Sequence, residues 1–277
     1  MKIIEPHIHM IARTTQDYER MVRMHTVACC EPAFWAGYDR TSAAAFYDYF
    51  THITTFEPTR AAQYLIQHYA WICLNPKEAD DLGLAREVLA FIPEFLEKPN
   101  VVGIGEIGLN KNTPNEMKVF EEQVELALQY NQLIWIHTPH LNDKLKGTRM
   151  LVDYLKGHGG VDPERVTFDH CEEHTIPMIR DAGFWSALTI YPVTKNSPAR
   201  VVDILERYGV DHMLVDASGD WGPSDPGTIH DAVFEMRRRG HPDSLVETVF
   251  YNNPCYFLGQ SDHFRLKPEL SKEEAWG

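Results

Sequence analysis

The chain has 277 residues, of which 44% are hydrophobic and 24% charged, and its formal net charge is −14 at pH 7. This length suits one (β/α)8 barrel of roughly 250 residues with a modest insertion and a tail, and no apolar run approaches the roughly 18 residues that a membrane span needs. The negative charge disfavours nucleic acid as a partner, because binding to DNA or RNA depends mainly on Lys and Arg neutralising phosphates.

Short hydrophobic runs alternate with amphipathic stretches along the whole chain. In chain order, the runs expected to be strands are residues 2–8, 25–30, 68–74, 101–107, 133–138, 165–170, 183–189 and 212–217. The helices expected between them are residues 16–24, 58–68, 77–95, 114–130, 141–157, 175–181, 197–208 and 226–239. Thr113 and Ser197, each followed by proline, are typical of helix N-caps. Eight strands separated by helices predict an α/β fold, a (β/α)8 TIM barrel.

One connection, residues 31–57, is too long for a simple crossover and is rich in aromatic side chains. We predict a single barrel domain over residues 1–260 that contains this insertion, followed by a polar C-terminal tail at 261–277. Because the insertion follows a strand, it should rise from the barrel rim that carries active sites. Packing on its own aromatics or at a subunit contact is favoured over a substrate-contacting lid, since apolar clusters usually serve packing. The sequence leaves open whether the protein forms a homo-oligomer.

The first candidate ligands are His7 and His9, which lie two residues apart on the first strand. Their side chains should project from the same face, about 6.6 Å apart at the backbone, a separation from which two imidazoles can converge on one ion. By itself the pair is a weak signal, because histidine has many uses that involve no metal.

Four further metal-binding side chains stand at or near the ends of later strands: Glu106, His137, His170 and Asp216. Each has an ordinary alternative, namely a salt bridge for Glu106, a core hydrogen bond for either histidine, or a turn cap for Asp216. The carboxyl ends of barrel strands meet at one face, however, so one binuclear site explains all six residues together. Imidazoles with two carboxylates favour two Zn²⁺ ions, while Mn²⁺ and Mg²⁺ are the alternative metals.

The order His-x-His, GEIGL, two single strand-end histidines and a late Asp resembles the TatD-related metal-dependent hydrolases of the amidohydrolase superfamily. The similarity extends from EPHIHM to NNPCYFLG, and its most specific piece is GIGEIGLN. The chain also looks like the TatD-like members of ebo-type biosynthetic gene clusters. The resemblance implies one metal held by His7, His9, Glu106 and Asp216, and a second held by Glu106, His137 and His170.

Residues around this core depart from the family's pattern. Family members with nuclease activity usually read GEIGLDY, whereas Asn110 and Lys111 follow the leucine here, and they often carry an Arg where this chain has Pro139. The family's HP after the third strand is replaced by Asn75 and Pro76, and its ETD at the last strand by residues 214–216. The metal core is therefore kept while its surroundings have changed.

The neighbours of His170 bear on the substrate. Glu172 and Glu173 would repel phosphate at close range, which disfavours a nuclease. Asp169 and Cys171 should face away from the pocket if the strand continues, because side chains alternate along a strand.

The favoured function is a metal-dependent hydrolase in which a binuclear centre activates water against an ester, amide or related bond of a small metabolite. Asp216 is the candidate base that takes the proton of that water. The alternatives are a TatD-like phosphodiesterase or DNase, a mononuclear metal-dependent lyase or decarboxylase, and a non-catalytic metal-stabilised binding protein. Candidate substrate contacts, each of which could instead be an ordinary loop residue, are His140, His174, Tyr191, Asp220 and Trp221.

The sequence also bears on the compartment. The first strand begins by Lys2, which leaves no room for a cleavable signal peptide ahead of the fold. The five cysteines are an odd number without zinc-knuckle spacing, which is typical of reduced, mostly buried thiols. We therefore expect a cytoplasmic protein.

Overall fold

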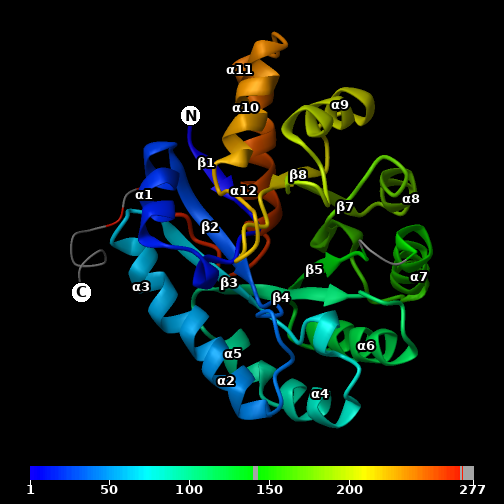
Figure 1. Ribbon diagram of the computed structural model, residues 1–277. Coiled ribbons are helices and arrows are strands. Elements are labelled where there is room, and N and C mark those ends of the chain that lie inside the picture. The colour runs from blue at the N-terminus through cyan, green and yellow to red at the C-terminus, as the bar shows by residue number, and fades with distance from the viewer. Residues whose placement is uncertain (140–142, 269, 271–277) are drawn as a thin grey trace.

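The computed structural model, which describes residues 1–139, 143–268 and 270, is a barrel of eight parallel strands that neighbour one another in chain order (Figure 1). Every strand pairs in parallel with the next, so the expected (β/α)8 TIM barrel is confirmed. The strands are β1 Ile3–Glu5, β2 Thr26–Pro32, β3 Gln67–Ile72, β4 Val101–Gly108, β5 Leu133–His137, β6 Val166–Phe168, β7 Trp185–Thr189 and β8 Met213–Asp216.

The barrel closes between β8 and β1 just beyond the strand ends. The Ser218 amide donates to the His7 carbonyl and the His9 amide donates to the Gly219 carbonyl, both at 2.8 Å. The buried Glu5 carboxylate joins the same two segments, because it accepts the amides of His7 at 3.1 Å and Ala217 at 3.2 Å. Burial raises the pKa of Glu5 to about 8. The segments that carry His7, His9 and Asp216 are therefore tied together by backbone contacts.

Helices follow the strands around the outside of the barrel (Figure 1). The α-helices are α1 Thr15–Arg23, α2 Ala43–Thr51, α3 Glu57–Ala62, α4 Leu82–Leu89, α5 Ile92–Leu96, α6 Pro114–Gln129, α7 Lys144–Gly157, α8 Ile176–Asp181, α9 Pro198–Tyr208, α10 Thr228–Arg238, α11 Asp243–Glu247 and α12 Asn253–Leu258. The shorter turns are η1 Met10–Ala12, η3 Pro76–Glu78 and η4 Pro163–Arg165, and the π-helical turns are η2 His52–Phe56 and η5 Thr248–Asn252. None of the helices described is long and apolar enough to cross a membrane.

Local sequence explains where several helices begin. Thr113 and Ser197 are N-caps as expected, since their hydroxyls accept the amides of Glu116 at 3.1 Å and Arg200 at 3.2 Å. The single helix expected at 77–95 is wrong, because the segment forms η3, α4 and α5. The Asp81 carboxylate caps a new helix by accepting the Gly83 amide at 3.0 Å, and Pro93 can occupy only the first turn of α5.

The helix expected at 58–68 is shorter than predicted, because it ends as α3 at Ala62 and β3 begins at Gln67. The helix α2 lies inside the aromatic insertion, and the two helices that the sequence did not indicate are α11 and α12.

Two buried indole side chains pack against each other inside the barrel. Trp71 and Trp135 are fully buried, with ring centroids 5.4 Å apart. The glycines of β4 make room for them: a Cβ on Gly103 would lie 2.5 Å from the Trp71 ring, and one on Gly105 would lie 2.5 Å from the Trp135 Cβ. These glycines therefore allow close packing on β4, and Glu106 follows Gly105 directly.

The aromatic insertion packs mostly on the outside of the barrel. The Phe50 ring, fully buried in α2, lies 5.4 Å from Phe95 and 6.0 Å from Phe91. Phe34 and Trp35, at the start of the insertion, instead line the cavity described below. The segment therefore combines helix packing with a short stretch at the rim.

Part of the segment expected to be a polar tail packs on the barrel. Phe264 is buried with its ring 4.7 Å from Tyr69, and the His263 Nδ1 lies 2.8 Å from the Val101 carbonyl oxygen. Both partners lie at or near the start of their strands, so residues 261–268 cover that end of the barrel. Residues 269 and 271–277 lie outside the described residues.

Replacing Phe50 with Ala should lower the free energy of unfolding by about 3–5 kcal/mol, because it leaves a cavity between α2 and α5. Urea denaturation followed by circular dichroism measures the effect. Phe56→Ala is the matched control, since that ring in the same segment is 55% exposed and should change stability by less than about 0.5 kcal/mol. Equal effects of the two substitutions would contradict the packing role of α2.

Candidate metal centre

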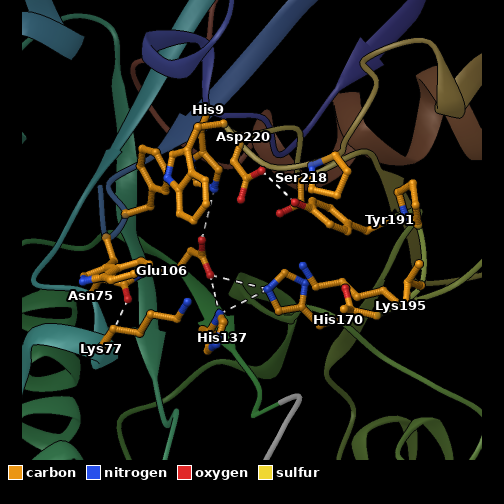
Figure 2. Close-up of a pocket in the computed structure, with 17 residues that line it drawn as sticks. His9, Asn75, Lys77, Glu106, His137, His170, Tyr191, Lys195, Ser218 and Asp220 are labelled. Atoms are coloured by element: carbon orange, nitrogen blue, oxygen red, sulfur yellow. Dashed lines mark hydrogen bonds and ion pairs between the residues drawn. The ribbon is translucent and has the colours of Figure 1, made fainter. Parts of the chain in front are cut away.

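A cavity of about 450 Å³ opens at the carboxyl ends of the strands, where a (β/α)8 barrel gathers its functional residues (Figure 2). Side chains that follow five of the strands line it: Phe34 after β2, Asn75 after β3, His170 after β6, Tyr191 after β7 and Ser218 after β8. Glu106 and His137, from β4 and β5, lie at its base.

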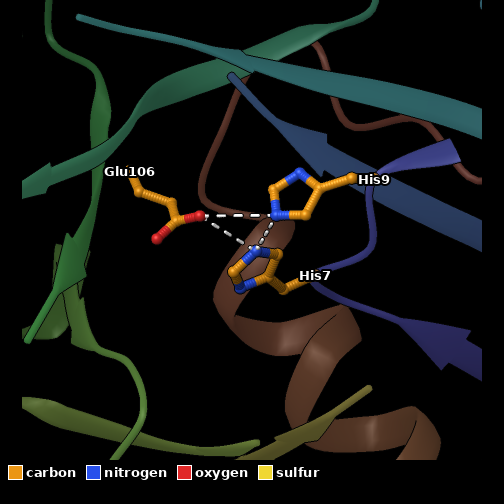
Figure 3. Close-up of side chains that lie close together, drawn as sticks. All are labelled: His7, His9 and Glu106. Atoms are coloured by element: carbon orange, nitrogen blue, oxygen red, sulfur yellow. Dashed lines mark hydrogen bonds and ion pairs between the residues drawn. The ribbon is translucent and has the colours of Figure 1, made fainter. Parts of the chain in front are cut away.

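His7, His9 and Glu106 form the first cluster at this base (Figure 3). The two imidazole Nε2 atoms lie 3.0 Å apart. The Glu106 Oε1 lies 3.2 Å from the Nε2 of His7 and 3.5 Å from that of His9. All three side chains are buried.

The outer ring nitrogens of both histidines are held by acceptors. The Nδ1 of His7 makes a short hydrogen bond to the Asp169 carboxylate, and the Nδ1 of His9 lies 3.1 Å from the Pro32 carbonyl oxygen. Since a carbonyl or carboxylate oxygen accepts only, each Nδ1 donates its proton outward, and each Nε2 points toward Glu106. Phe34 stacks on the His9 ring at 3.9 Å between centroids, which fixes its plane.

Glu106, His137 and His170 form a second cluster on the other oxygen of the same carboxylate. The Glu106 Oε2 lies 2.5 Å from the His137 Nδ1 and 3.6 Å from the His170 Nε2, and those two nitrogens are 3.1 Å apart. Glu106 therefore stands between the two clusters with one oxygen directed to each, as a bridging carboxylate would.

Asp169 faces into the barrel, so the expectation that it points outward is wrong. Its carboxylate accepts the Trp135 indole N–H at 2.9 Å and the Thr189 hydroxyl at 2.8 Å, in addition to the contact with His7. The prediction assumed that strand alternation continues, but β6 ends at Phe168 and His170 has a φ of +58°. The chain turns there, and both Asp169 and His170 enter the site.

Asp169 also orients His170 through Thr189. The Thr189 hydroxyl gives its proton to Asp169, so it accepts from the His170 Nδ1 at 2.7 Å. The lone pair of the His170 Nε2 is thereby directed to Glu106. Burial opposes the charge on Asp169, but His170 and His7 hold the pKa of its carboxyl well below the ordinary value.

Asp216 is fully buried, and neither of its carboxylate oxygens has a hydrogen-bond partner. It groups with His7 and Asp169, whose ligand atoms all lie within 4.8 Å of one another. Burial, and then the charge of Asp169, raise the pKa of Asp216 well above its ordinary value. An orphaned buried carboxylate beside an imidazole is the arrangement that a cation would satisfy.

The whole arrangement fits bound cations. The Nε2 atoms of His7 and His9 and the Glu106 Oε1 face one another at about hydrogen-bond distance. Although burial opposes it, Glu106 and Asp169 raise the pKa of His7 well above its usual value, so these carboxylates favour a positive charge here, either a proton on His7 or a bound cation. Two groups of nitrogen and oxygen donors that share Glu106 suit divalent ions such as Zn²⁺.

The predicted substrate contacts divide into three groups. Tyr191, Asp220 and Trp221 line the cavity, and the Tyr191 hydroxyl donates to the Asp220 carboxylate at 2.8 Å. His174 is not among the cavity residues in the part of the chain described; its imidazole is half-exposed and lies 4.0 Å from Glu172. His140 lies outside the described residues.

Glu172 and Glu173 do not face the cavity, which overturns their use as an argument against phosphate. Arg200 binds both, at 3.0 Å to Glu172 and 2.5 Å to Glu173, so their charges are largely neutralised. The cavity instead contains Lys77 and Lys195, which sequence reasoning missed. No short motif marks them, because each stands alone in a loop or turn.

Comparisons with known proteins identify the family of this chain. The family model described as TatD related DNase matches residues 11–248. A relative from Methanocaldococcus jannaschii, described as an uncharacterized metal-dependent hydrolase, is 26% identical over 245 residues, which cover 85% of this chain and 88% of the relative. The fold and the site define the class of metal-dependent hydrolases. Within that class, the chain belongs to the TatD family.

Solved structures share the fold. A TatD-like protein from Archaeoglobus fulgidus superposes with a TM-score of 0.73 at 21% identity, covering 92% of this chain and 99% of that one. An organophosphorus hydrolase from Deinococcus radiodurans gives a TM-score of 0.64 at 14% identity, covering 93% and 92%. A beta-aspartyl dipeptidase from Fervidobacterium islandicum gives 0.61 at 13% identity, covering 92% and 74%.

Asp169→Asn should weaken metal binding by about 10–100-fold, because the amide cannot hold His7 and Thr189 as the carboxylate does. Competition with a chromogenic chelator measures the affinity for zinc. Asp181→Asn, the same change at an exposed position of α8, is the control and should leave the affinity unchanged. Unaltered zinc affinity in Asp169→Asn would remove Asp169 from the site's support.

Proposed function

We propose that this protein is a hydrolase that uses two divalent ions, Zn²⁺ in the first place, to activate water against an ester, amide or related bond of a small metabolite. The convergence of the His7, His9 and His170 Nε2 atoms on the two oxygens of Glu106 carries the proposal. In this assignment His7, His9, Glu106 and Asp216 hold one ion, while Glu106, His137 and His170 hold the other.

Each group in the site has a role in this reaction. The ions supply a water of lowered pKa and polarise the oxygen of the bond under attack. Asp216 takes the proton of that water and returns it to the leaving group. Asp216 is buried, and within the described part of the chain neither oxygen has a hydrogen-bond partner, so one oxygen can hold the ion while the other accepts the proton. Phe34, Trp35 and Trp221 line the cavity and limit the water around the reacting bond.

The cavity favours a small substrate. A volume of about 450 Å³ lies within the range typical of small-molecule sites, and the net charge of −14 opposes long-range attraction of a polyanion.

The five cysteines, none in a disulfide, support placement in the cytoplasm.

A phosphodiesterase is the second candidate. The description of the matching family supports it, as do Lys77 and Lys195 in the cavity and the pairing of Glu172 and Glu173 with Arg200. Degradation of single-stranded DNA by metal-loaded protein, lost on His170→Ala, would rank this activity first.

Metal removal tests the reaction class. Protein treated with a chelator should lose turnover of its best substrate, found in a panel of esters, amides and phosphoesters, and added Zn²⁺ or Mn²⁺ should restore it. Elemental analysis of the active protein should give about two ions per chain. A ratio of one would favour the lyase or decarboxylase alternative, and full occupancy without turnover would favour a binding protein.

Asp216→Asn should abolish turnover while metal content stays near normal, since the amide cannot accept the proton of the attacking water. The decrease should reach about 10²–10⁴-fold, the usual contribution of a positioned general base. Activity assays paired with elemental analysis separate the two effects. Asp203→Asn, on the exposed outside of α9, is the control with the same chemistry. Surviving activity in Asp216→Asn would remove it as the base.

A further inference from the structure

Two lysines of the cavity wall are uncommitted. Lys77 lies in η3 and Lys195 in the loop after β7, and both line the cavity. Within the part of the chain that the structure describes, neither ammonium group makes a hydrogen bond or an ion pair. Each lies over an aromatic ring instead: the Lys77 Nζ is 4.6 Å from the Trp35 centroid, and the Lys195 Nζ is 4.7 Å from the Tyr191 centroid. The rings position the two charges without neutralising them.

Three other partly buried cations have polar partners among the described residues. Arg40 binds Glu78 at 2.5 Å, and Arg200 binds Glu172 and Glu173. Lys144 donates to the Thr138 hydroxyl at 3.2 Å and to the Pro139 carbonyl at 3.1 Å. Lys77 and Lys195 differ from these, so their charges are available to a ligand.

Both lysines reach toward the candidate metal centre. Figure 2 shows Lys77 and Lys195 on opposite sides of Glu106, His137 and His170. The candidate metal centre therefore lies between two lysine side chains of the cavity wall.

The nearby carboxylate of Asp220 does not satisfy these lysines. It accepts the Tyr191 hydroxyl at 2.8 Å and the Gly222 amide at 2.7 Å, which hold it on its own side of the cavity. Burial lowers the pKa of Lys77, and Lys195 adds to that shift against the pull of Glu106 and Asp220. The two positive charges are thus close enough to repel each other, and an anion between them would relieve that repulsion.

We propose that Lys77 and Lys195 bind a carboxylate or phosphate monoester group carried by a small substrate, next to the bond that is hydrolysed at Glu106. This inference rests on the proposed function and names the substrate class of the same site. The anionic group is separate from the reacting bond, and its ion pairs with the lysines orient that bond toward Asp216. Trp35 and Trp221 offer apolar surface to the remaining part of the substrate.

Anion binding by the metal-loaded full-length protein tests the two lysines directly. Inorganic phosphate and succinate are titrated by calorimetry into the wild type, Lys77→Met, Lys195→Met and Lys195→Arg. We expect each Met variant to bind one of the two anions at least about tenfold more weakly, the loss of a charge-assisted hydrogen bond. Lys195→Arg should keep most of the affinity because it keeps the charge. The anion whose affinity falls identifies the group that is recognised.

Lys146→Met is the matched control, since it removes the same charge from an exposed position of α7. It should bind both anions as the wild type does. Equal affinities across wild type, Lys77→Met and Lys195→Met would overturn the proposal, and so would an equal loss in the Lys146→Met control.

Turnover separates this inference from the proposed function. Three matched aryl esters are compared, one neutral, one with a carboxylate and one with a phosphate monoester. The wild type should favour one anionic ester by at least about tenfold in kcat/KM, and both Met variants should lose that preference. No hydrolysis of any ester, amide or phosphoester, with the calorimetric difference intact, would refute the hydrolase and leave the anion site standing. Hydrolysis without an anionic preference in the wild type would support the hydrolase and refute the anion site.

Discussion

The hydrogen bonds that meet at Asp169 are the constraint on which the site depends. This one buried carboxylate holds the Nδ1 of His7 directly and orients His170 through the Thr189 hydroxyl. Each of these imidazoles therefore donates its Nδ1 proton away from the cavity and directs its Nε2 atom toward Glu106. Buried nitrogen and carboxylate atoms that converge in this way favour a positive charge between them, whether a proton or a bound cation.

The barrel can hold these buried polar groups in place because its interior is closely packed and closed. Trp71 and Trp135 fill the space beneath the site, and the glycines of β4 let them approach the strand that carries Glu106. The Trp135 indole also donates to Asp169, so packing and polar contacts reinforce each other. Low polarity around Glu106 strengthens every charge interaction there, which explains why small displacements of these side chains should matter.

The site has two parts with different origins. The inner part, made of the candidate metal ligands, is built on the strand ends of a chain that belongs to the TatD family. The outer part is built on loops, where Phe34, Trp35, Lys77, Lys195 and Trp221 form the cavity wall. Strand ends are held by the barrel's hydrogen bonds, whereas loops tolerate change. Reaction chemistry and substrate choice can therefore vary separately in such a protein.

The sequence by itself determined the eight strands, the barrel and the strand-end residues His7, His9, Glu106, His137, His170 and Asp216, because hydrophobic periodicity is a local signal and parallel strands share one carboxyl edge. It misplaced Asp169, since alternation does not predict the turn at which His170 takes a φ of +58°. It also misjudged Glu172 and Glu173, whose partner Arg200 lies in the next helix but one, and it missed Lys77 and Lys195. Only the tertiary structure decided these points, because they depend on which loops and helices meet in space when the barrel closes.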